Sequence, residues 1–152
     1  MTLVELMVAA VLIATFFTAI FEVNAVCLRY VAAGKESLAA ISAANDRAEN
    51  LRNLAFSDLT STTEVAELLI GPANASPWAS NASEVVKISA FPTPNGVTQF
   101  TRTPSGQVTL NSTAASLGNT LVLVEVTASF KGLGNRTRSE VVSVIVSNGS
   151  KK

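Results

Sequence analysis

One acidic side chain near the start of the chain has the setting of a buried ion pair. Glu5 is the only ionisable side chain among residues 1–21, and its neighbours are Leu, Val, Met and Ala. A carboxylate in an apolar, membrane-like setting costs roughly 2.5–3.5 kcal/mol and usually marks a function or a partner. Residues 1–28 hold no Lys or Arg, so the candidate cation is the α-amino group of Met1, in the same chain or in another copy. The plainer alternative is that Glu5 reaches the lipid headgroups.

Other site chemistries find little support in the composition. The chain has no His and one Cys, which rules out a Ser-His-Asp triad and a disulfide within one chain and nearly excludes zinc or haem sites. The sequence contains no phosphate-binding loop, nucleophile elbow or calcium loop. Three acids after residue 83 (Glu84, Glu125 and Glu140) stand far apart, which favours exposed or paired side chains over catalytic ones. We therefore expect no catalytic site, no metal and no cofactor.

Candidate glycosylation sites are more numerous. Eleven Asn residues, with Ser or Thr at about one position in five, predict roughly two Asn-x-Ser/Thr sequences by chance. The chain has five of them, at Asn74, Asn81, Asn111, Asn135 and Asn148. The alternatives are sugars linked to Ser or Thr and a polar surface that carries no sugar.

The charges are balanced overall but divided along the chain. Eleven basic and eleven acidic side chains give a net charge of zero, with −4 over residues 1–70 and +4 over residues 71–152. Such halves would help like subunits to stack, although a chance distribution explains them equally well. A small basic group has no aromatic residues interleaved with it, which argues against a nucleic-acid partner; it consists of Arg136, Arg138, Lys151 and Lys152.

The element that positions Glu5 is a long apolar helix. Residues 6–21 carry no charge, Gly or Pro, and 19–20 helical residues cover the roughly 30 Å hydrocarbon layer of a bilayer. We predict that residues 1–25 span a membrane. The segment does not resemble a secretory signal peptide, since no basic region precedes it and no cleavage site follows it.

The helical pattern continues to about residue 55. Apolar residues recur every three, four or seven positions, including Cys27, Leu38, Ile41, Ala44 and Leu51, as on one face of a helix. Most charged residues fall off this stripe. The pattern predicts one helix over residues 1–55, apolar all round at first and then amphipathic, with Cys27 as a buried apolar residue.

The start of this helix resembles a known family. Thr2-Leu3-Val4-Glu5-Leu6-Met7-Val8-Ala9 is similar to the mature N-terminus of type IV pilins and of the pseudopilins of type II secretion. The resemblance implies that a prepilin peptidase removes a leader, that Met1 is then N-methylated, and that Glu5 pairs with the Met1 amine of a neighbouring subunit.

Two positions depart from the pattern of many pilins. A helix-breaking Gly near residue 14 and a Pro near residue 22 are common in the family, and here these positions are Ala14 and Glu22. Without this Pro, the chain is more similar to minor pilins and pseudopilins than to many major pilins.

The remainder of the chain predicts a small sheet domain. Residues 56–83 suggest a connecting loop with a short helix over residues 64–70, capped by Thr63, and with Trp78 packed in the core. Residues 84–152 contain runs with strand character at 84–91, 97–103, 107–111, 120–130 and 136–147, separated by Pro and Gly turns. The expected fold is α+β: a long N-terminal helix against an antiparallel sheet of four to five strands joined by hairpins.

We expect a structural subunit of a type IV pilus-like filament that polymerises through its N-terminal helix. Its implied partners are copies of itself, the prepilin peptidase and the inner-membrane assembly machinery. It would wait in the inner membrane and then enter a filament on the cell surface. The alternatives are a secretion or DNA-uptake pseudopilin in a short periplasmic fibre, and a single-pass anchored envelope domain that never polymerises.

Overall fold

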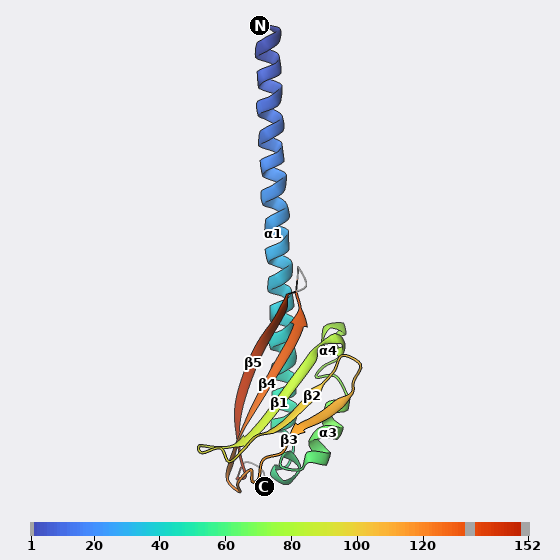
Figure 1. Cartoon of the computed structure of the whole chain (residues 1–152), viewed down its shortest axis with the longest axis vertical. Coiled ribbons are helices and arrows are strands. Elements are labelled where there is room, and N and C mark those ends of the chain that lie inside the picture. The colour runs from blue at the N-terminus through green and yellow to red at the C-terminus, as the bar shows by residue number, and fades with distance from the viewer. Residues whose placement is uncertain (1, 133–135, 150–152) are drawn as a thin grey trace. The chain divides into compact units, whose positions relative to one another are not determined.

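The computed structural model describes residues 2–132 and 136–149 (Figure 1). The chain divides into two compact units at the boundary between residues 35 and 36. The first unit is helical throughout its described length after residue 2. The second contains the rest of the first helix, three short helices and a sheet. In chain order the elements are α1 (Leu3–Arg52), α2 (Phe56–Leu59), α3 (Thr62–Ile70), α4 (Pro77–Asn81), β1 (Ser83–Ala90), β2 (Thr98–Arg102), β3 (Val108–Ser112), β4 (Leu121–Lys131) and β5 (Thr137–Ser147).

The predicted long helix is confirmed as α1, which begins at Leu3 and ends at Arg52, three residues before the expected end. Ala14 and Glu22 both lie within the unbroken helix, because neither removes a backbone donor as Pro would. After Arg52 the Leu54 amide donates to the Leu51 carbonyl at 3.2 Å, and this tighter turn directs the chain into α2.

The antiparallel sheet is also confirmed, with five strands among the described residues in the order β3-β2-β1-β4-β5. Consecutive strands pair within β1–β2–β3 and within β4–β5, as the Pro and Gly turns predict. The step from β3 to β4 differs from a hairpin: β4 pairs with β1 along Ser83–Ala90. Apolar alternation cannot specify which strands become neighbours. In the fold, this crossing gives the most apolar strand, β4, a partner on both sides.

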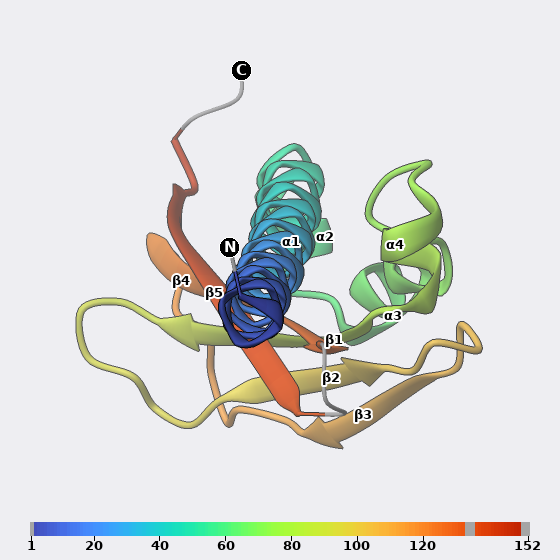
Figure 2. The same cartoon turned by 90° about the horizontal axis from the view of Figure 1, so that it is seen from above.

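One face of the sheet packs against the helices. Figure 2 shows α3 and α4 on the same side of the sheet as α1. The inward residues of β4 are fully buried, and β1 and β2 add Ile88 and Phe100 to the same core. From α1 the core receives Ala44, Ala48 and Leu51.

The buried face of α1 differs from the predicted stripe at several positions. Leu38 and Ile41 are 68% and 39% exposed, whereas Arg47 is buried. Alanines dominate the face turned toward the sheet, because small side chains let a helix lie close to strands whose own Val and Ile side chains already fill the space.

Three details of the connecting segment were predicted wrongly. Residues 56–59, expected in the loop, form the short helix α2. Helix α3 begins at Thr62, so its N-cap is Ser61 and not Thr63. The stretch expected as a loop contains α4, whose N-cap Ser76 accepts a hydrogen bond from the Ala79 amide at 3.1 Å and whose first residue is Pro77. A Ser followed by Pro is a sequence signal for a helix start.

Candidate functional site

The N-terminal end of α1 is closed by a reciprocal pair of hydrogen bonds. The backbone amide of Thr2 donates to Oε2 of Glu5 at 2.8 Å, and the amide of Glu5 lies 3.4 Å from Oγ1 of Thr2 as a weaker second contact. This is the capping-box arrangement, in which each residue accepts from the other's amide. Glu5 is also favourably placed as an acid in the first turn, where the helix dipole is positive.

This capping box is a role for Glu5 that the sequence prediction missed. The signal was present, because Thr2-Leu3-Val4-Glu5 has the Thr-x-x-Glu spacing of the motif. Met1, the predicted methylated residue and ion-pair partner, lies outside the described residues. In the part of the chain that the structure describes, Glu5 therefore has a partner in its own chain.

Behind Glu5 the helix presents apolar side chains on every side. All described residues of the first 32 are exposed, including Leu6, Phe16 and Phe21 at 66–68%. Within residues 6–21 the polar side chains are two threonines, and both are satisfied within the helix: the Thr15 hydroxyl donates to the Leu12 carbonyl and the Thr18 hydroxyl to the Ala14 carbonyl. The stretch 6–21 consequently needs no external hydrogen-bond partner, and the next polar side chains, Glu22, Asn24 and Arg29, are exposed.

The length and composition of this segment suit a bilayer. Among the described residues α1 is the one helix long and apolar enough to cross a membrane, and its apolar stretch lies near the N-terminus. Cys27, expected to be buried, is exposed in the single chain, because a lone helix has no second layer to cover it. By length and composition this helix could cross a membrane.

No family model, curated protein or solved structure matches this chain. The function of the chain is therefore inferred from its own residues.

The candidate glycosylation sites differ in how far their amide nitrogens are engaged. The Asn74 nitrogen donates to Asp46 at 2.6 Å, that of Asn81 to the Pro77 carbonyl at 2.9 Å, and that of Asn148 to the Asn119 carbonyl at 2.8 Å. Asn111 lies exposed on β3 and uses its carbonyl oxygen instead, accepting from the Thr101 hydroxyl at 2.7 Å. Of the described sites, Asn111 is thus the one most ready for modification; Asn135 lies outside the described residues.

A buried charge cluster connects α1 to the sheet. Nε of Arg47 lies 2.7 Å from Oε2 of Glu84. The two terminal nitrogens of Arg47 donate hydrogen bonds to the carbonyls of Leu68 and Gly71. Arg102 approaches the same carboxylate at 3.7 Å, and all three side chains are at most 4% exposed. Glu84 thus proves to be paired, one of its two predicted environments.

The role of this cluster is structural. Arg47 holds the end of α3 and the start of β1 against α1, so it fixes where the connecting segment attaches. Arg47 lies at helical spacing from the buried residues Ala40, Ala43, Ala44 and Leu51. That spacing was the sequence signal for its burial, although most charged residues of the helix are expected on the other face. Within the described residues no group of three His, Cys, Asp or Glu lies close enough to hold a metal.

Proposed function

We propose that this chain is a pilin-like subunit that polymerises into a filament through the N-terminal half of α1. The observation that carries the proposal is the apolar surface of that half, exposed around its whole circumference and headed by Glu5. Fully burying one large apolar side chain contributes about 1.5–3 kcal/mol, so an exposed array of them strongly favours association.

The same surface serves two environments in turn. In the bilayer, lipid covers residues 3–25. When a subunit leaves the bilayer, neighbouring copies must cover those side chains instead, since water would not. The change of environment by itself supplies the reason to assemble, and the second unit remains outside the apolar core.

Glu5 gives this association a register. In an apolar core a carboxylate and an ammonium attract strongly, while either one alone is costly. We infer that the Met1 amine of an adjacent subunit approaches Glu5 and fixes the axial position of one helix against the next. The capping box holds the carboxylate at the helix end, where a neighbour's N-terminus would meet it.

The decisive experiment examines fibres sheared from cells that express the chain. Negative-stain electron microscopy should show filaments, and mass spectrometry of the sheared fraction should find this chain with an N-methylated Met1. Fibres confined to the periplasm would assign the chain to a pseudopilus. Subunit found only in the membrane fraction, with no fibre under any condition, would contradict the proposal and leave an anchored envelope domain.

A further inference from the structure

The edge of the sheet that β5 forms is long and unprotected. β5 is the last strand of the sheet, and it pairs with β4 over eleven consecutive positions without a break in register. Its residues 141–147 contain no charged residue and no Pro. Edge strands are usually kept from further pairing by charges, Pro, bulges or shortness. The opposite edge strand, β3, is five residues long, and its register with β2 shifts between Gln99 and Phe100, as at a bulge. Residues 141–147 of β5 have none of these protective features.

The register with β4 determines which backbone groups of β5 point outward. The Asn148 amide donates to the Thr120 carbonyl at 2.9 Å, and the Arg136 carbonyl accepts from the Gly132 amide at 3.0 Å. In an antiparallel pair, residues that are hydrogen-bonded to the partner strand alternate with residues whose N–H and C=O groups point the other way. The even-numbered residues of β5 therefore bond to β4, and the backbone groups of its odd-numbered residues face away from the sheet.

The side chains of these odd-numbered residues are exposed and partly apolar. Val141 and Ile145 are 57% and 48% exposed, and Ser143 between them is exposed as well. An edge of this kind can accept a further extended strand, because backbone hydrogen bonds hold the new strand and the side chains that face each other across the pair select its sequence.

The sequence of β5 is complementary to itself. In an antiparallel pair of two copies centred on Ser143, odd-numbered residues meet odd-numbered residues, so the outward backbone groups of both strands face each other. Val141 of each copy then lies opposite Ile145 of the other. Centring the pair on Val141 instead would put Ile145 opposite the polar Thr137, and a parallel pair in register would put Glu140 beside its own copy, where like charges repel. We propose that β5 pairs with β5 of a second copy of this chain, antiparallel and two-fold about Ser143, in one sheet that continues through both subunits.

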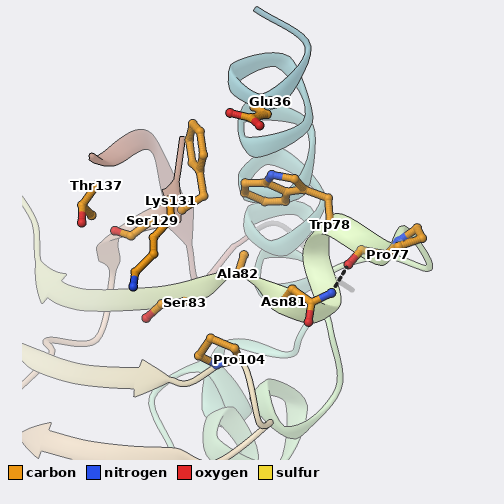
Figure 3. Close-up of a pocket in the computed structure, with 11 residues that line it drawn as sticks. Glu36, Pro77, Trp78, Asn81, Ala82, Ser83, Pro104, Ser129, Lys131 and Thr137 are labelled. Carbon is orange, nitrogen blue, oxygen red and sulfur yellow. Dashed lines mark hydrogen bonds between the residues drawn. The ribbon is translucent and has the colours of Figure 1, made fainter. Parts of the chain in front are cut away.

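The start of the strand lies outside this contact. Thr137 is at the rim of a pocket that Glu36, Trp78 and Phe130 also line (Figure 3), and residues 133–135, shortly before it in the chain, lie outside the described residues. Residues 141–145 follow later in the strand. The contact uses the second unit alone, so its test is separate from that of filament formation through the first.

Disulfide cross-linking tests the register. The full chain with Cys27→Ser, in polyoxyethylene-ether micelles, receives one new cysteine and is oxidised with copper phenanthroline. Two facing residues of a hydrogen-bonded antiparallel pair have Cα atoms about 5.5 Å apart, which is within disulfide reach. We expect Ser143→Cys to cross-link into dimers and Val141→Cys to do so at least fivefold less, because the proposed register sets the two copies of residue 141 roughly 14 Å apart along the strand. An equimolar mixture of Val141→Cys and Ile145→Cys should cross-link at least fivefold more than either variant alone.

A charge placed on the edge provides a second test. Adding Val141→Lys to the Ser143→Cys chain should lower cross-linking at least fivefold, because Lys on an edge strand opposes pairing. The matched control is Thr109→Lys, at an exposed position of the other edge strand, β3, and it should leave cross-linking unchanged. Equal cross-linking of Ser143→Cys and Val141→Cys, or none of Ser143→Cys, would overturn the proposal. An effect of Thr109→Lys as large as that of Val141→Lys would overturn it as well.

Discussion

Glu5 has one partner within its own chain and would gain a second in the proposed filament. Within the chain it accepts from the Thr2 amide at 2.8 Å, a capping contact that stabilises a helix by about 0.5–2 kcal/mol. In an assembly it would also meet a neighbour's ammonium. A carboxylate has two oxygens and can accept several hydrogen bonds, so the cap and the ion pair can coexist on one side chain.

Substitutions at Glu5 separate the cap from the charge. Glu5→Ala removes both, while Glu5→Gln keeps the capping box, which Gln also forms, and removes only the charge. We expect both variants to reach the membrane at near-normal levels, because removing a charge from a span favours insertion. Both should reduce sheared filament at least tenfold, measured by immunoblot against membrane-fraction subunit.

Thr2→Ala is the matched control, because it weakens the cap and keeps the carboxylate. Its filament yield should stay within about twofold of normal. If Glu5→Gln assembled normally while Glu5→Ala did not, the cap rather than the ion pair would be the function of Glu5. Normal assembly of Glu5→Ala would leave apolar packing alone as the driving force.

At the scale of elements, α1 combines two kinds of helix surface. Its N-terminal part is apolar on all sides, whereas the part in the second unit buries alanines and one arginine against the sheet. Arg47, Glu84 and Arg102 provide the polar connection between that helix and β1 and β2. Such a cluster is costly to break, because removing one partner leaves uncompensated buried charge.

Glu84→Gln should therefore destabilise the second unit strongly. Two buried guanidinium groups would lose their carboxylate, at a cost of about 3–5 kcal/mol, which for a chain of this size lowers the Tm by on the order of 10 °C. Thermal unfolding followed by circular dichroism in micelles measures this. Glu49→Gln, which breaks the exposed pair with Arg52, should shift the Tm by no more than about 2 °C. Equal Tm shifts in the two variants would show that the buried cluster stabilises the fold no more than the exposed ion pair does.

At the scale of the whole molecule, assembly should cover the first unit and leave the sheet accessible. Cys27 reports on this, because it is the only cysteine of the sequence and is exposed in the single chain. Micelle-dispersed subunit should react fully with a maleimide reagent, and intact filaments should react at least tenfold more slowly. As a control, Thr93→Cys in a Cys27→Ser background places the thiol in an exposed loop of the second unit and should react equally in both states. Fast labelling of Cys27 in filaments would place residue 27 outside their core.

Surface modification is a second prediction at this scale. We expect subunit isolated from its native cells to exceed the unmodified 15.8 kDa by more than one methyl group, with the extra mass on the peptide that contains Asn111. Asn111→Gln should remove that mass, and Asn74→Gln should not, because the Asn74 nitrogen is held by Asp46. A mass of 15.8 kDa plus one methyl group would rule out glycosylation.

Local patterns were enough to predict much of this architecture. The uncharged run at residues 6–21 predicted the apolar helix, and the Pro and Gly turns predicted the strands. These features depend on residues close in sequence, where helix and strand periodicity operate. The capping box of Thr2 and Glu5 belongs to the same class, since its spacing of three residues was readable in advance.

Contacts between distant residues were decided only by the tertiary structure. The pairing of β1 with β4, the burial of Arg47 beside Glu84, and the exposure of Leu38 all depend on which surfaces meet. The pocket of Glu36, Trp78 and Phe130 likewise combines three elements far apart in the chain. Periodicity states which side chains share a face. The balance of packing, burial and charge over the whole second unit decides what that face contacts, and no local stretch of sequence contains that balance.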